Sequence, residues 1–238
     1  MKDDTRDSDV ERRLEAWAAG YSSAGISPEL ARKVRQALEP SLIPVKPIPS
    51  RGRLFFVLLA VFVAGSAGLS ALMSKTGLHL ITPLQIGGIS AIFSGGGILF
   101  IVKLSEQMIP GSRALIPLWG LLLLVGVVVF GGLTTLFPWQ TSGSFVPEGW
   151  PCAAMELTLV IPATAIFWLL ARKGALFASA GLGATLTGLA AFLVLIPLQS
   201  QCMFQMAPHL LVWHGGTAVL MIGLGALVGS LRCGRSSS

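Results

Sequence analysis

Six long runs of apolar residues follow one another along the chain after residue 53. Each approaches the ~20 residues that an α-helix needs to cross ~30 Å of hydrocarbon. The predicted spans lie near Leu54–Met73, Ile81–Val102, Ala114–Phe137, Ala153–Ala171, Ala175–Leu198 and Pro208–Leu231. The second is rich in Gly and Ser, which are common where transmembrane helices pack closely. The pattern predicts an all-α, polytopic membrane protein whose residues 54–231 form a six-helix transmembrane bundle.

Residues 1–53 have a different pattern, with ten of the seventeen Lys and Arg residues and eight of the eleven Asp and Glu residues. Two short amphipathic helices are predicted here, followed by a proline-rich spacer between Pro40 and Pro49. Their apolar stripes are Val10, Leu14 and Trp17 in the first helix and Leu30, Val34 and Leu38 in the second. Because helices this short are marginal alone in water, we expect the stripes to bind a partner or to rest on the membrane surface.

Composition and charge support this division. Hydrophobic residues make up 53% of the chain and charged residues 12%, against roughly 25% charged residues in soluble domains. The net charge of +6 could suggest nucleic-acid binding, but in a membrane protein Lys and Arg mark the cytoplasmic side. With both termini inside, only Lys75 falls in an outer loop. The chain is therefore predicted to have an N-in, C-in topology with a cytoplasmic tail at residues 232–238 and no direct contact with nucleic acid.

Two cysteines fall on the outer side in this topology. Cys152 precedes the fourth span and Cys202 precedes the sixth, whereas Cys233 lies on the cytoplasmic side. In an oxidising compartment Cys152 and Cys202 can form a disulfide or act as a redox-sensing pair. The alternative is that they are unpaired, inert thiols. Their positions at the starts of two predicted transmembrane helices, and not at helix centres, favour a sensing role.

Polar residues near these cysteines suggest further chemistry. Beside Cys152 and Cys202, the histidines His79, His209 and His214 could supply ligands for zinc, copper(I) or cadmium, but the CxxC and HxxxC spacings of local metal motifs are missing. The sequence therefore favours packing and hydrogen-bonding roles for His209 and His214. Glu156 lies one helical turn after Cys152 and should point into the bundle, with either histidine as a partner. Trp213 is expected in the interfacial aromatic belt.

No motif of an enzyme is found. The sequence has no phosphate-binding P-loop, HExxH, GxSxG or CxxC dithiol, so neither catalysis nor a cofactor is expected.

The second half of the chain resembles the NrsF-type anti-sigma factors of proteobacteria. The resemblance is densest over Glu148–Leu231. It rests on Trp150-x-Cys152, Pro162, Arg172-Lys173, the glycines Gly181, Gly183 and Gly188, Cys202, and Trp213-His214. The N-terminal segment is longer here than the family leads us to expect.

This resemblance implies a negative regulator in the bacterial inner membrane. Its cytoplasmic N-terminal segment would hold an extracytoplasmic-function (ECF) sigma factor away from RNA polymerase. Cys152 and Cys202 would be needed to sense an envelope stress signal, either a redox change or a heavy metal.

Two other functions remain open from the residues alone. A small-solute or metal-ion transporter with a regulatory N-terminal tail would need a midplane site, for which Gln85, Glu156 and His214 are the candidates. A thiol oxidoreductase coupled to quinone is disfavoured by the missing CxxC.

Overall fold

The computed structural model describes residues 50–73, 76–109, 115–141, 143–171 and 179–235, together with Arg12, Ala16, Glu29, Arg32, Lys33 and Gln36. The chain divides into two compact units, Met1–Pro47 and Ile48–Ser238, so the boundary lies in the predicted proline-rich spacer. The described residues of the first unit are helical and exposed, and Glu29 pairs with Lys33 at 3.3 Å. The six predicted sigma-binding residues, Val10, Leu14, Trp17, Leu30, Val34 and Leu38, lie outside the described residues.

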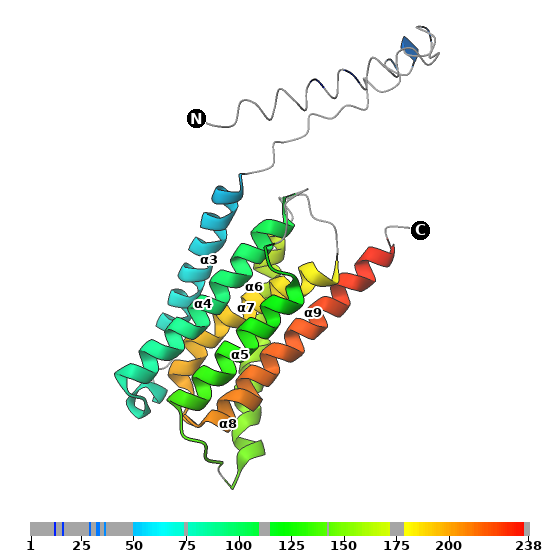
Figure 1. Ribbon diagram of the computed structural model, residues 1–238. Coiled ribbons are helices and arrows are strands. Elements are labelled where there is room, and N and C mark those ends of the chain that lie inside the picture. Colours follow the sequence, from blue (N-terminus) through cyan, green and yellow to red (C-terminus); the bar gives the residue numbers. More distant parts are fainter. Residues whose placement is uncertain are drawn as a thin grey trace. The chain divides into compact units, whose positions relative to one another are not determined.

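The second unit is a bundle of helices (Figure 1). They are α3 (Arg51–Leu72), the 3₁₀ turn η2 (Thr76–Leu80), α4 (Pro83–Gln107), α5 (Leu118–Leu136), α6 (Phe145–Ala171), α7 (Ala180–Gln201), α8 (Ala207–His209), the π-helical turn η3 (Leu210–Gly215) and α9 (Gly216–Arg235). Six helical segments, the last formed by α8, η3 and most of α9, are long and apolar enough to cross a membrane. No strand occurs in the described ranges, which confirms the predicted all-α, six-helix class.

Helix α7 forms the centre of the bundle, where it packs against α3, α4, α6 and α9. Almost all of its side chains from Leu182 to Leu198 are buried. Small residues in α7 make this close packing possible. Gly183 lies against the backbone of Gly225 in α9, and the ring of Phe100 in α4 covers Gly188.

The glycines of α4 have the same packing role. The ring of Phe192 lies over Gly96, and the ring of Phe62 lies over Gly97. A methyl group at either position would collide with the ring. The Gly and Ser content that weakens the second span as a hydrophobic signal therefore lets α3, α4 and α7 approach one another.

Helices α6 and α4 extend furthest beyond their predicted limits. Helix α6 begins at Phe145, eight residues before the predicted span, and continues through Pro151. Cys152 therefore lies about two turns inside a helix and not at its start. Helix α4 continues past Val102 to Gln107 and thereby includes Lys103 and Glu106.

These two charged residues form a network at the end of the bundle where α3 begins. The Glu106 carboxylate is buried and lies 3.2 Å from the Arg51 guanidinium and 3.4 Å from the Lys103 ammonium. Lys103 also donates a hydrogen bond to the carbonyl of Ile116 at 2.6 Å. Charged groups this buried persist only when they are paired, so the network fixes the start of α3 against the end of α4.

Candidate functional site

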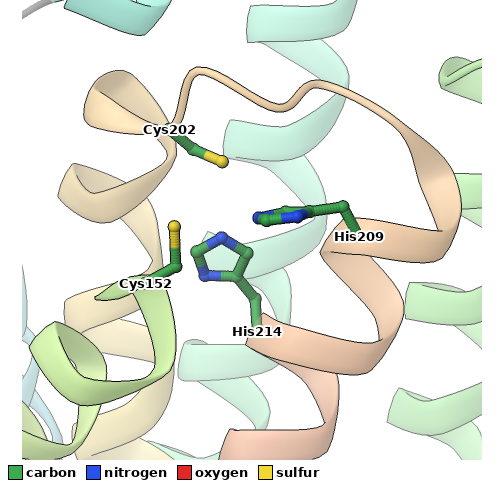
Figure 2. Close-up of side chains that lie close together, drawn as sticks. All are labelled: Cys152, Cys202, His209 and His214. Atoms are coloured by element: carbon green, nitrogen blue, oxygen red, sulfur yellow. The ribbon is translucent and has the colours of Figure 1, made fainter. Parts of the chain in front are cut away.

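Two cysteines and two histidines meet at the opposite end of the bundle (Figure 2). Cys152 comes from α6, Cys202 from the residue after α7, His209 from α8 and His214 from η3. Each side chain offers one sulfur or nitrogen atom, and these four atoms all lie within 4.8 Å of one another. The cluster thus joins the starts of the fourth and sixth spans to the end of the fifth.

Helix α6 holds Cys152 against the sixth span. Gly149, almost one turn earlier, lies under the indole of Trp213 so closely that a Cβ atom there would overlap the ring. The Cys152 sulfur lies 4.0 Å from the carbonyl oxygen of Glu148. One turn beyond Cys152, Glu156 is directed toward the same cluster because residues four apart share a helical face.

Cys202 is held by the loop that it begins. Its backbone N–H donates to the carbonyl of Leu198 at 3.2 Å and so caps α7. The Gln205 side chain donates to the Cys202 carbonyl at 2.7 Å, and Gly77 of η2 packs against the same carbonyl. The thiol itself donates to the Phe204 carbonyl at 3.5 Å. The sulfur is therefore fixed by backbone contacts and not by packing alone.

The π-helical turn brings the two histidines together. In an α-helix of 3.6 residues per turn, positions five apart diverge by about 140°. In η3 the Gly216 N–H bonds to the carbonyl of Leu211, five residues back, so that positions five apart come into line. As a result, the ring centroids of His209 and His214 are 5.7 Å apart.

Two phenylalanine rings lie against His209. Phe145 lies 6.4 Å from the His209 ring and 5.8 Å from Trp213, and Phe204 lies 5.2 Å from His209, measured between ring centroids. His209 and His214 are only 3% and 2% exposed. The His209 imidazole is thus held by rings that offer it no hydrogen bond, and His214 packs against His209 in turn.

Several buried polar atoms at this site have no hydrogen-bond partner. They are Nε2 of His209, both ring nitrogens of His214 and both carboxylate oxygens of Glu156. Nδ1 of His214 and a carboxylate oxygen of Glu156 are 3.5 Å apart, which is long for a hydrogen bond. Leaving a buried donor or acceptor unsatisfied costs about 1–3 kcal/mol, so this site is built at a cost to stability.

The two thiols are free and they interact. Neither cysteine is in a disulfide. The adjacent Cys152 sulfur and then burial raise the pKa of the Cys202 thiol above its ordinary value, since a proton between two sulfurs is held by both. The pair can therefore share one proton, lose both to a metal ion, or be oxidised to a disulfide.

A groove of about 250 Å³ leads to both cysteines. Glu148, Met155 and Met203 lie along it, and the two methionines are 41% and 53% exposed. Cys152 is half-buried, whereas Cys202 is 3% exposed. Small ions and oxidants can thus reach the sulfur atoms along a path lined by soft thioethers and one carboxylate.

The structure brings most of the predicted site residues together. Cys152, Cys202, Glu156, His209 and His214 form one site, and Trp213 packs beside it. Both histidines present a ring nitrogen within 4.8 Å of the cysteine sulfur atoms, whereas the sequence favoured packing and hydrogen-bonding roles for them. The missed signal was the five-residue interval between them, which has meaning only if the helix contains a π turn.

Two residues named from the sequence do not join this site. His79 is exposed on η2. Gln85 accepts from the Thr82 N–H at 2.8 Å and donates to the Leu136 carbonyl at 2.8 Å, so its amide serves the capping box of α4.

No family model, curated protein or solved structure matches this chain.

Proposed function

We propose that the protein is a membrane-embedded anti-sigma factor that holds an ECF sigma factor at the bacterial inner membrane and releases it on a redox or heavy-metal signal. The observation that carries the proposal is the convergence of Cys152 and Cys202 within 4.8 Å, at the end of the bundle opposite Arg51. Since the chain continues from Arg51 into the N-terminal segment, the reactive cluster and the charged N-terminal segment connect to opposite ends of the bundle.

The charge distribution supports an orientation with the cluster outside. Apart from Lys75, the Lys and Arg residues belong to residues 1–53, to the last turns of α4 (Lys103), to the segments around Arg113 and Arg172–Lys173, or to residues 232–238. The positive-inside rule then gives N-in and C-in. Fusion of green fluorescent protein or alkaline phosphatase after Ser238 tests this orientation. Fluorescence without phosphatase activity is expected, and the reverse pattern would reject it.

Binding of the sigma factor is assigned to the apolar stripes of the N-terminal segment. An amphipathic helix in a groove is anchored by residues at i, i+4 and i+7, as Val10, Leu14 and Trp17 are spaced. The full chain should co-purify with the ECF sigma factor encoded nearest to it. Leu14→Asp combined with Trp17→Asp should abolish co-purification, because two charges would enter an apolar contact.

A matched control adds the same two charges elsewhere. Ala16→Asp with Gln36→Asp changes two exposed helical residues and should leave co-purification intact. Equal co-purification of both double variants would reject the helix-in-groove binding mode. Co-purification of no ECF sigma factor with the wild-type chain would reject the function itself.

Sensing is assigned to the two thiols. In cells, sigma-dependent transcription should rise on treatment with oxidants or thiophilic metals in the wild type, but not in the Cys152→Ser, Cys202→Ser double variant. Wild-type induction in that variant would remove the thiols from the mechanism.

The transporter alternative has less support. It needs a polar site at mid-membrane, but Gln85 is occupied at the first turn of α4 and the Glu156–His214 pair belongs to the cysteine cluster at the bundle end. Uptake of metal into vesicles containing the purified protein would favour the transporter.

A further inference from the structure

We propose that Cys152, Cys202, His209 and His214 form a four-ligand binding site for a thiophilic divalent cation, with Zn²⁺ as the physiological class and Cd²⁺ as a stronger-binding mimic. Metal binding stands on the geometry alone, whereas its role as the signal rests on the proposed function.

The donor set and its dimensions fit such an ion. Two thiolates and two imidazoles are the Cys₂His₂ set of tetrahedral zinc sites, with bonds of about 2.3 Å to sulfur and about 2.0–2.1 Å to nitrogen. Tetrahedral angles then separate the ligand atoms by roughly 3.3–3.8 Å. The four atoms are already within 4.8 Å of one another. Side-chain rotations that move the ligand atoms by about an ångström would therefore close the site around an ion.

The unpartnered atoms point to a missing ligand. Buried imidazole nitrogens almost always have a partner, yet Nε2 of His209 and both nitrogens of His214 have none. Aromatic rings close one side of the cluster, and the side chains that do lie near these nitrogens, the two thiols and the Glu156 carboxylate, form no well-aligned hydrogen bond with them. A metal ion bound to one nitrogen of each ring provides the partner that the protein lacks.

Glu156 supplies the supporting contact that such sites use. Metal-bound histidines commonly donate their second N–H to a carboxylate, which fixes the ring and makes it a stronger ligand. The Glu156 carboxylate lies 3.5 Å from Nδ1 of His214 and is fully buried. This contact leaves Nε2 of His214 for the ion. A dication balances the two thiolates, so the Glu156 carboxylate contributes the one remaining negative charge of the site.

The coordination and the access path select the class of ion. Sulfur and imidazole ligands favour Zn²⁺, Cd²⁺ and Cu⁺ over Mg²⁺ and Ca²⁺, which take oxygen ligands. Four protein ligands also leave no open position for a reacting water, as in zinc sites that fix structure. The groove past Met155 and Met203 gives such an ion a route to the sulfur atoms.

Zinc binding is measured on the full chain, purified in detergent under reducing conditions without sigma factor. One Zn²⁺ per chain is expected by elemental analysis after dialysis, and Cd²⁺ should produce a thiolate-to-cadmium absorption band. Cys152→Ser, Cys202→Ser, His209→Gln and His214→Gln should each weaken zinc binding by more than about 10-fold, since loss of a residue that merely supports a ligand already costs that much.

Two substitutions serve as matched controls. His79→Gln changes an exposed histidine outside the cluster, and Cys233→Ser changes a thiol near the far end of α9. Both should bind zinc as the wild type does. To separate misfolding from ligand loss, zinc should also protect Cys152 from alkylation in the unaltered wild-type chain.

Three results would overturn the inference. These are a reduced wild-type chain that binds no zinc, zinc binding that survives both histidine substitutions, and zinc that gives Cys152 no protection. If zinc binding fails while the sigma factor still co-purifies, the metal site is wrong and the proposed function stands. If zinc binds and no ECF sigma factor co-purifies, the reverse holds.

Discussion

At the scale of single residues, Glu156 has an unusual position. It is fully buried, and its carboxylate lies 3.5 Å from Nδ1 of the His214 ring without a hydrogen bond that meets geometric criteria. A buried carboxylate with so little compensation is costly, which is understandable if it orients a histidine for a metal ion.

We therefore expect Glu156→Ala to weaken zinc binding about 10–100-fold, the usual effect of removing a carboxylate that supports a metal-bound histidine. Glu156→Gln should have a smaller effect because an amide oxygen still accepts from the imidazole N–H. Zinc competition with a chromophoric chelator measures both. Glu148→Gln is the control, since that carboxylate accepts from Ser144 on the groove. Equal affinities of wild type and Glu156→Ala would contradict the supporting role.

The sequence predicted part of this site. Cys152 and Cys202 could be paired because the topology put both on one side of the membrane. Glu156 could be assigned to the same face as Cys152 from its four-residue spacing. The sequence named both histidines but could not place their rings together, because an α-helix separates positions five apart by about 140°. Sequence periodicity does not reveal where a helix adopts a π turn.

At the scale of elements, the π turn η3 sets the alignment of the histidines, and its register can be tested. Deleting Val212, a half-exposed residue of this turn, should let the segment become α-helical. His209 and the next histidine would then be four positions apart and about 40° from alignment, so zinc binding should survive.

Inserting one alanine after Val212 should have the opposite effect. Six positions in an α-helix leave the histidines about 120° apart, so one of them must leave the cluster and zinc affinity should fall as in His214→Gln. Elemental analysis of the two variants side by side decides this. A deletion that destroys the site, or an insertion that preserves it, would show that the π turn is not what aligns the rings.

The contact between α7 and α9 depends on glycine. Gly225 lies against the carbonyl of Gly183 and the side chain of Thr187, whereas Gly223 on the same helix has open space around it. Gly225→Val should therefore destabilise the bundle by about 1–3 kcal/mol or more, as overpacking does. Gly223→Val should have little effect. Thermal unfolding in detergent compares them, and similar transition temperatures would contradict this packing.

At the scale of the whole molecule, the sequence was sufficient for the class of fold and the number of spans. Hydropathy reports which residues lipid can surround, and this signal is strong in six runs. The same hydropathy signal did not predict that α6 begins at Phe145 or that α4 ends at Gln107. Polar residues such as Glu148 and Glu106 lower the hydropathy there, yet they continue helices whose charges are paired or lie at the bundle end.

Contacts connect the cysteine cluster to the start of α3. Gly77 of η2 packs against the Cys202 carbonyl, and η2 links α3 to α4. At their other ends these two helices are joined by Arg51 and Glu106. A movement of Cys202 can thus reach the point where the N-terminal segment begins, provided that α3 and α4 have two arrangements.

Breaking the Arg51–Glu106–Lys103 network should uncouple changes at the cysteine cluster from the start of α3, where the N-terminal segment begins. Glu106→Gln leaves Lys103 buried without its counter-charge, which should cost about 3 kcal/mol of stability. Zinc binding should be retained because the cluster lies at the other end. Under the proposed function, sigma-dependent transcription should become insensitive to the inducing signal. Arg53→Gln, an exposed residue in the same first turn of α3, is the control. A normal response of Glu106→Gln cells would mean that the signal does not pass through this network.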